Sequence, residues 1–216
     1  MSELRYWLAL LRAPGLGTRG ALEVLTRTSP EALFNAALAS EVRERLRSET
    51  RDFLRNPDWS AVNADLAWLA TSPRNHIITL HDASYPRLLK EIADPPLVLF
   101  VHGDPAVLNQ PQIAMVGSRN PTPQGVENAH AFAQSFARTG LTITSGLALG
   151  IDAACHEGAL AGQGHTIGVM GTGLDRVYPK RHHALAHEIA AQGALISEFP
   201  PGTPPLKENF PRRNRI

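Results

Sequence analysis

One arrangement of residues, which occurs three times, does most to limit how this chain can fold: an apolar run, a glycine turn and a helical pattern. The first apolar run, residues 113–116, reads as a buried strand that breaks at Gly117, and a helical pattern follows over residues 124–138. Residues 141–146 and 166–171 open the second and third copies. Right-handed crossovers make such consecutive strands parallel, so we expect all three glycine turns at one edge of one sheet, where open α/β sheets bind ligands.

Cationic residues follow two of these turns. Arg119 comes two residues after the first strand, where its side chain can lie over the pocket that the turn lines. Backbone N–H groups at a strand–glycine–helix turn, together with the positive end of the helix dipole, favour an anion. Lys180 and Arg181 follow the third turn and stand at the start of a helical pattern, which is an unfavourable place for cations without an anionic ligand.

The rest of the chain divides into a helical and a sheet-forming part. Residues 1–70 carry helical patterns throughout, and apolar strand patterns begin near residue 76. We therefore predict a small all-α domain over residues 1–70, a linker at residues 71–75, and an α/β domain over residues 76–216. The α/β domain is predicted to hold a mostly parallel sheet with helices on both faces.

A glycine-rich turn lies between the first two predicted helices, at residues 14–20 (Pro-Gly-Leu-Gly-Thr-Arg-Gly). Such a turn resembles a helix-hairpin-helix, in which turn amides bind a nucleic-acid phosphate. The turn is also compatible with a plain pair of antiparallel helices, in which glycine meets the geometry of the turn. Because only one copy of the motif is present, we favour this simpler interpretation.

Composition excludes several classes of protein. The 216 residues carry a net charge of only +1, so any attraction for a polyanion must be local. The single cysteine, Cys155, excludes an internal disulfide and fits a reducing compartment. The chain starts without a secretion signal and contains no apolar run of membrane-spanning length, so we expect a cytoplasmic protein without a membrane partner.

No pattern of a nucleotide cofactor, a metal site or a catalytic site stands out. The first glycine turn is neither G-x-x-x-x-G-K-[ST] nor G-x-G-x-x-G. Asp152 and His156 lie one helical turn apart, but neither a nucleophile nor a set of metal ligands accompanies them. We interpret them as a capping aspartate and a packed histidine, with Cys155 as a small core residue.

Five short motifs in chain order resemble the DNA-processing protein A family (DprA, also called Smf). Each motif is weak alone, but their order and spacing together are specific. They are Gly117-Ser118-Arg119, residues 145–152 (Ser-Gly-Leu-Ala-Leu-Gly-Ile-Asp) with His156, residues 171–175 (Gly-Thr-Gly-Leu-Asp) with Tyr178-Pro179, residues 197–202 (Ser-Glu-Phe-Pro-Pro-Gly) and residues 210–215 (Phe-Pro-Arg-Arg-Asn-Arg).

The resemblance implies an extended Rossmann-like domain that binds single-stranded DNA without a cofactor and is not an enzyme. It implies that the protein protects incoming DNA strands in natural transformation, loads the RecA recombinase onto them, and forms a homodimer through this domain. The helices of residues 1–70 are similar to the sterile-alpha-motif-like (SAM-like) domain of many members. Members often continue to a winged-helix domain, so we expect this sequence to be truncated at its carboxyl-terminal end.

Carried over to this sequence, the implied DNA-binding residues are Gly117, Ser118, Arg119, Ser145, Gly146, Lys180, Arg212 and Arg213. Which of the two last arginines faces DNA stays open. The sequence departs from the family pattern at Leu149, where many members have arginine, and at His182, where asparagine is common. Tyr178 and Phe210 are the aromatic residues nearest the basic ones and are candidates for stacking on bases.

Two other functions compete with DNA binding. Related Rossmann-like phosphoribohydrolases, which release bases from nucleoside monophosphates, share the glycine turns. Their Pro-Gly-Gly-x-Gly-Thr loop is followed by a catalytic glutamate, whereas here Gly171-Thr-Gly is followed by Leu-Asp-Arg-Val. A purely structural adaptor acting through residues 1–70 is the second alternative.

Overall fold

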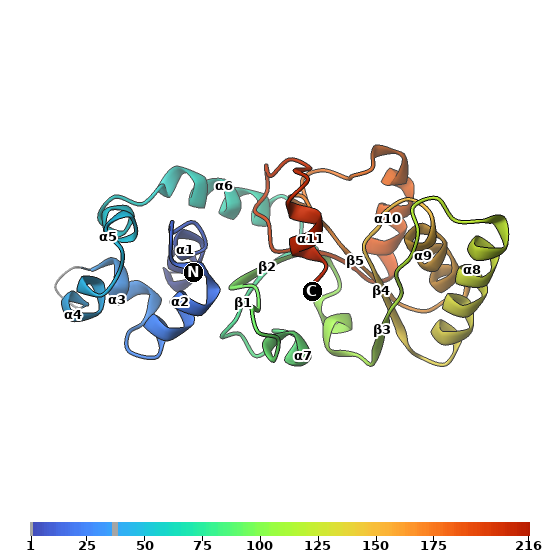
Figure 1. Ribbon diagram of the computed structural model, residues 1–216, viewed down its shortest axis with the longest axis horizontal. Helices are drawn as coiled ribbons and strands as arrows, with labels where there is room; N and C mark the ends of the chain where they lie inside the picture. The colour runs from blue at the N-terminus through green and yellow to red at the C-terminus, as the bar shows by residue number, and fades with distance from the viewer. Residues whose placement is uncertain (1, 36–38) are drawn as a thin grey trace.

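Figure 1 shows the computed structural model, which describes residues 2–35 and 39–216. A group of helices forms one end of the elongated molecule, and a sheet with its covering helices forms the other. Residues 1 and 36–38 of the predicted helical segment lie outside the described residues. Of the helices in the described part, none combines the length and the apolar character needed to cross a bilayer.

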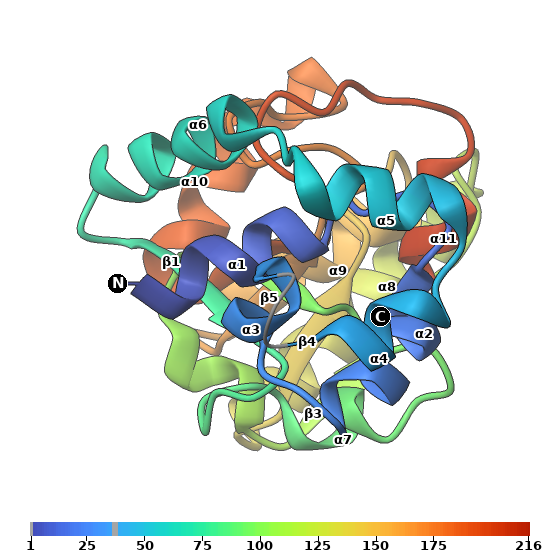
Figure 2. The ribbon, with the colours of Figure 1, turned by 90° about the vertical axis from the view of Figure 1, so that its left-hand side faces the viewer.

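The amino-terminal segment is helical, as the sequence predicts (Figure 2). Ser29 and Asp58 cap two of its helices, since their side chains accept hydrogen bonds from the amides of Ala32 (3.1 Å) and Ala61 (3.0 Å). The helices are α1 (Ser2–Leu10), α2 (Gly17–Leu25), α3 (Pro30–Phe34), α4 (Ser40–Glu44), α5 (Ser48–Arg55) and α6 (Trp59–Ala70).

The turn between α1 and α2 depends on its glycines. Gly15 and Gly17 have φ values of +71° and +58°, which side-chain-bearing residues rarely adopt. The carboxylate of Glu49 lies directly against Gly15, and Arg47 lies 3.9 Å from that carboxylate. The glycines thus meet the geometry of the turn, and the choice of a plain helical hairpin over a phosphate-binding one stays a prediction.

The remaining residues build a mostly parallel α/β fold, which confirms the predicted class. Within the described residues, a six-stranded sheet has the order β1-β2-β6-β5-β4-β3. Strands β3, β4, β5 and β6 run parallel to one another, and β2 is antiparallel to both β1 and β6. The strands are β1 (Asn75–Thr79), β2 (Val98–Gly103), β3 (Gln112–Ala114), β4 (Thr142–Ser145), β5 (Thr166–Val169) and β6 (Ala194–Ser197).

Long helices cover one face of the parallel strands. Helices α8 (Pro123–Arg138), α9 (Ile151–Ala161) and α10 (His183–Gln192) follow β3, β4 and β5. Ile143 of β4 packs among alanines of α8 and α9, and Leu195 of β6 packs against α10. Thr122 caps α8 by accepting a hydrogen bond from the Gly125 amide at 3.1 Å, so this helix begins close to the predicted residue 124.

Shorter elements lie over the opposite face. A groove of about 540 Å³ separates this face from α7 (Arg87–Lys90) and the 3₁₀ helix η1 (Pro105–Asn109). The in-register residues Ala114, Thr144 and Ile167 of three adjacent strands line the groove. Helix α11 (Asn209–Arg213) follows β6, and Ile216 reaches the same groove.

The prediction of a buried strand at residues 113–116 is wrong. Strand β3 is the edge strand of the sheet: Gln112 and Ala114 are exposed, Ile113 is half-buried, and Val116, beyond the strand, is 78% exposed. An apolar run records a preference for burial but not the position of the strand within the sheet. The order of the strands, which sequence periodicity does not encode, leaves this one with a neighbour on one side.

One hydrophobic core joins the helical segment to the sheet. It includes Trp7 of α1, Phe100 of β2 and Ile196 of β6. The ring of Trp68 in α6 lies 5.8 Å from that of Phe100. The predicted linker, residues 71–75, connects α6 to the first residue of β1. Apolar packing is continuous across this boundary.

Candidate nucleic-acid interface

A pocket of about 310 Å³ opens where β3, β4 and β5 end. Gly117 of the first turn and Gly146 of the second both line it, so these turns meet at one edge of the sheet, as parallel crossovers require. The third turn adjoins them through α11, because Gly171 packs against the ring of Phe210. The polar residues that line the pocket are Arg119, Thr144, Ser145, Asp152, Arg213 and Asn214.

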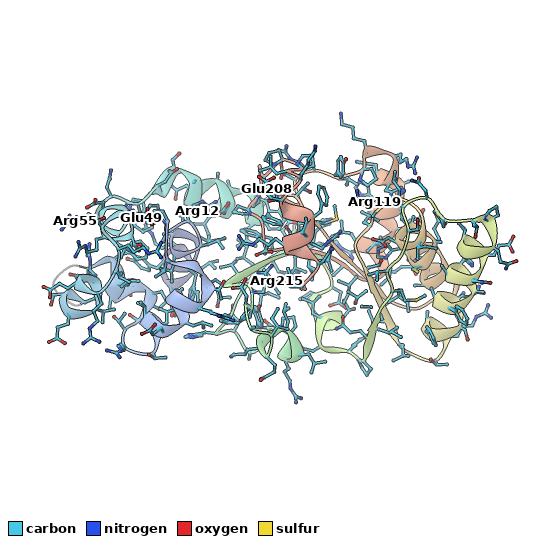
Figure 3. The ribbon with its side chains drawn as sticks, viewed as in Figure 1. Arg12, Glu49, Arg55, Arg119, Glu208 and Arg215 are labelled. Atoms are coloured by element: carbon cyan, nitrogen blue, oxygen red, sulfur yellow. The ribbon has the colours of Figure 1, made fainter. Side chains whose placement is uncertain are left out.

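The first turn presents open backbone donors. Within the described residues, the amides of Gly117, Ser118 and Arg119 have no protein acceptor. Arg119 has no carboxylate partner there either, and its guanidinium carbon lies 5.8 Å from the centre of the Phe210 ring. Figure 3 marks Arg119 in the part of the molecule that α9 and α10 occupy. Exposed amides next to an unpaired arginine form a site for an anion.

The start of α9 supports this turn from behind. The Ile151 amide donates to the Ser118 carbonyl at 3.1 Å, and the Ile151 side chain packs where a β-carbon at Gly117 would lie. Gly150 has a φ of +82°, and a β-carbon there would collide with the Ser118 carbonyl. The close approach of the two backbones explains why glycine occupies both positions.

The second turn differs from the sequence expectation of free amides. The Asp152 carboxylate accepts hydrogen bonds from the amides of Gly146 (3.1 Å) and Ala148 (3.2 Å). Asp152 lies in the first turn of α9, where the helix dipole favours an anion, so the chain supplies its own negative group to these donors. Ser145 is also engaged, because its hydroxyl donates to the Met115 carbonyl at 2.6 Å.

The two consecutive arginines of α11 point in different directions. Arg213 is only 6% exposed and donates to the carbonyls of Gly146, at 2.7 Å, and Val169. Burial and the nearby Arg119 lower the pKa of Arg213, and Asp152 acts in the opposite sense. Arg212 has a half-exposed side chain that pairs with the buried Glu198 at 3.0 Å.

Lys180, which follows the third turn, is not among the residues that line this pocket. It is exposed at the start of the 3₁₀ helix η2 (Lys180–His182) and has no ion pair within the described residues. His182, at the end of η2, donates through Nδ1 to the Leu147 carbonyl of the second turn at 3.0 Å. His182, which replaces the asparagine common in the family, therefore anchors η2 to the second turn.

Aromatic rings adjoin the basic residues. Tyr178 is 46% exposed, and the centre of its ring lies 5.5 Å from that of Phe210. Phe210 in turn lies beneath Arg119. The two rings form the kind of surface on which a nucleic-acid base stacks.

The interpretation of Cys155 and His156 as packed core residues is confirmed, whereas that of Asp152 as a helix cap is wrong. Gly150 occupies the N-cap position of α9, and the Asp152 carboxylate instead accepts from the amides of Gly146 and Ala148, which precede the helix. His156 is fully buried, with Nδ1 2.7 Å from the Thr166 hydroxyl, and burial lowers its pKa to about 3. Burial raises the pKa of the Cys155 thiol to about 11, which makes it unreactive at neutral pH. Among the residues that the structure describes, no three histidine, cysteine or acidic side chains are grouped as metal ligands.

The family model "DNA recombination-mediator protein A" matches residues 76–216. The chain belongs to this family. It is 38% identical over 217 residues to Protein Smf of Escherichia coli, and it spans 57% of that protein. It is 45% identical over 135 residues to DNA processing protein DprA of Streptococcus pneumoniae, an alignment that covers 62% of this chain and 48% of that protein. The chain thus spans about half the length of these relatives.

Solved structures of the family agree with the fold. The crystal structure of DprA from S. pneumoniae superposes with a TM-score of 0.81 at 33% identity, covering 98% of this chain and 73% of that chain. DprA from Helicobacter pylori superposes with a TM-score of 0.58 at 34% identity, covering 64% of this chain and 63% of that one. That second structure is described as giving insight into a single-stranded DNA binding mode of the H. pylori protein.

Sequence reasoning missed two supporting residues, Asp152 as the anion of the second turn and Glu198 as the partner of Arg212. Glu198 also pairs with Arg215, which lies next to α11 in Figure 3. A local signal existed for α11: Phe210 and Arg213 are three residues apart and share a helix face, whereas Arg212 does not. Because Phe210 packs inward on Gly171, Arg213 is placed inward with it.

Proposed function

We propose that the chain binds single-stranded DNA at the pocket where β3, β4 and β5 end. The observation that carries the proposal is the first turn, in which open amides stand beside Arg119, an arginine without a carboxylate partner in the described residues. A phosphate accepts from such amides and from a guanidinium at once. Lys180, exposed after the third turn, would hold a neighbouring phosphate.

The aromatic pair supports single-stranded over double-stranded DNA as the ligand. Tyr178 presents an exposed ring on which an unpaired base can stack, and the half-buried Phe210 lies between it and Arg119. In a duplex the base faces are already stacked on one another. Contacts to phosphates and ring faces carry little sequence information, so we expect binding without strong sequence preference.

The basic and glycine-turn residues at this site then take different roles. Arg119 and Lys180 are proposed as phosphate contacts. Arg212 is a weaker contact, because Glu198 already neutralises part of its charge. Gly117 and Ser118 contribute backbone donors, while Ser145 and Gly146 form the wall of the pocket.

Family membership extends the proposal to a role in DNA processing during natural transformation. The protein would protect incoming strands, help to load RecA onto them and act as a cytoplasmic homodimer through its Rossmann-like domain. Light scattering of the purified protein tests the dimer. RecA filament formation on protein-coated strands tests the loading.

A phosphoribohydrolase is the alternative function. Asp175 is the acidic residue nearest the place of that family's catalytic glutamate. Its carboxylate accepts from the Gly202 amide at 2.7 Å and pairs with Arg176 at 2.9 Å. Burial alone would raise the pKa of Asp175, but these hydrogen bonds outweigh burial and lower it. Incubation with nucleoside monophosphates, with free base as the readout, should yield no product.

Fluorescence anisotropy with a labelled oligonucleotide, single-stranded or annealed, tests the main proposal. Single-stranded affinity should exceed double-stranded affinity and fall steeply between about 50 and 200 mM salt. Arg119→Ala should weaken binding about tenfold and reduce the slope of log K against log salt by about 0.7. Arg138→Ala, at the exposed far end of α8, is the matched control. Unchanged affinity in Arg119→Ala would reject the site.

A further inference from the structure

We propose that Arg213 is a positioning residue of the DNA site: it fixes the second turn, and through it the first, without contacting DNA. The inference rests on the proposed function. It also addresses which of the two arginines of the Phe-Pro-Arg-Arg segment faces the strand, by giving Arg213 a role without DNA contact.

Arg213 joins the ends of two strands. Its Nη1 donates to the carbonyl of Gly146, after β4, and to that of Val169, the last residue of β5. Its Nε donates to the Asn214 side chain at 3.1 Å. A β-carbon at Gly146 would lie 2.5 Å from Nη1, so glycine is the residue that lets the guanidinium approach.

Gly146 is consequently held from both sides. Its carbonyl accepts from Arg213, and its amide donates to Asp152. Both charged residues are only 6% exposed, and the negative charge of Asp152 favours the charged form of Arg213, although no direct ion pair joins them in the described residues. Moving either residue would leave a backbone group of Gly146 without its hydrogen-bond partner, so the arrangement resists change.

The constraint reaches Arg119 through the start of α9. Asp152 follows Ile151, whose amide donates to the Ser118 carbonyl and whose side chain fills the space beside Gly117. Gly150 lies against the backbone of Ser118 and Arg119. A shift of the second turn would therefore move the open amides and the guanidinium of the first.

Direct contact of Arg213 with a phosphate is the competing explanation, because Nη2 has no acceptor in the described residues and Arg213 lines the pocket. The two roles predict different effects in combination with Arg119→Ala. A second phosphate contact adds its own loss of affinity to that of Arg119, whereas a residue that acts by positioning the first turn loses less than the sum, because the contact it positions is already gone.

The experiment measures single-stranded affinity for the whole chain and its variants. Arg213→Met should weaken binding about tenfold, and combining it with Arg119→Ala should weaken binding by less than the sum of the two single losses. Arg213→Lys keeps the charge but cannot reproduce the planar bridge between two carbonyls, so it should not restore affinity. Additive losses in the double variant, or rescue by lysine, would overturn the proposal.

Asp152→Asn gives a second, independent test in case Arg213→Met folds poorly. Removal of a negative charge beside the pocket should strengthen DNA binding if simple attraction decides affinity. If Asp152 and Arg213 together position the turns, the variant should instead bind several-fold more weakly. Tighter binding would contradict the positioning role. Absence of DNA binding by the unaltered chain would instead reject the proposed function itself.

Discussion

The first and second glycine turns follow neighbouring parallel strands and line the same pocket, yet their chemistry is opposite. In the part of the chain that the structure describes, the amides of the first turn have no hydrogen-bond acceptor, and its exposed arginine has no ion pair. The second turn is closed by a buried carboxylate on its amides and a buried guanidinium on its carbonyl. The first is therefore suited to a ligand and the second to rigidity.

The difference shows that a glycine turn at the ligand edge of a sheet is not by itself a binding site. Both turns satisfy the same local pattern of strand, small residues and helix. Asp152 decides the difference, since an aspartate in the first turn of α9 takes the place that an external anion would occupy. Helix α8 has no acidic residue in its first turn, so the amides before it stay open.

The largest expected effect comes from breaking the closed turn. Asp152→Ala leaves Arg213 buried without its counter-charge and the Gly146 amide without its acceptor, so the free energy of unfolding should fall by about 3 kcal/mol. Urea denaturation measures this loss. Glu188→Ala, which removes an exposed carboxylate of α10, should change the free energy of unfolding by less than about 0.5 kcal/mol. Equal losses in the two variants would refute the structural role of the second turn.

Gly150→Ala should disturb the packing of α9 against the first turn. The new β-carbon meets the Ser118 carbonyl at a φ of +82°, so stability should fall by about 2 kcal/mol and DNA affinity should fall with it. Gly140→Ala is the matched control: its φ is +88°, but its β-carbon meets nothing within 4 Å. The control should lose about 1 kcal/mol of stability and none of the affinity. Loss of affinity in Gly140→Ala would show that the assay reads general destabilisation.

A pH series tests the packing beneath the closed turn. His156 has a pKa of about 3 in the folded chain against 6.5 for an unperturbed histidine. The unfolded chain therefore binds a proton below pH 6.5 that the folded chain excludes, and stability falls as the pH drops from 6.5 towards 3. Between pH 7 and pH 5 this amounts to about 2 kcal/mol. His156→Gln should remove that part of the pH dependence, whereas the exposed His183→Gln should retain it.

The smallest expected effect comes from Lys180, which lies outside the pocket. Lys180→Ala should weaken single-stranded DNA binding about threefold and reduce the salt slope by about 0.7, because an exposed lysine contributes one screened phosphate contact. Lys90→Ala, on α7, removes an equally exposed lysine away from the pocket and should leave affinity unchanged. Identical behaviour of the two variants would remove Lys180 from the site.

Much of the fold follows from the sequence, because strand and helix periods are local. The runs that end at Gly117, Gly146 and Gly171 predict parallel strands that meet at one edge, and the structure places them there. The exposure of β3 could not be predicted, since it depends on which strands become neighbours. Periodicity along a single strand carries no such information.

The site was predictable to a lesser degree. Arg119 could be placed over the pocket because it lies in the turn between β3 and α8. The spacing of Phe210 and Arg213 indicates a shared helix face, but the partners of the buried Arg213, Gly146 and Val169, lie 67 and 44 positions away in the sequence, and no local pattern identifies them. Whether a turn amide faces solvent or a carboxylate is likewise settled by tertiary packing, as Asp152 illustrates.

The hydrophobic core that runs from Trp7 through Phe100 to Ile196 has a consequence for how the molecule responds to stress. With no gap in apolar packing between helices and sheet, the amino-terminal helices cannot swing as a separate body without exposing the interior of both parts. The two parts should melt together as a single cooperative unit. The helices thus contribute to the stability of the sheet through this shared core, although they lie at the other end of the molecule from Arg119.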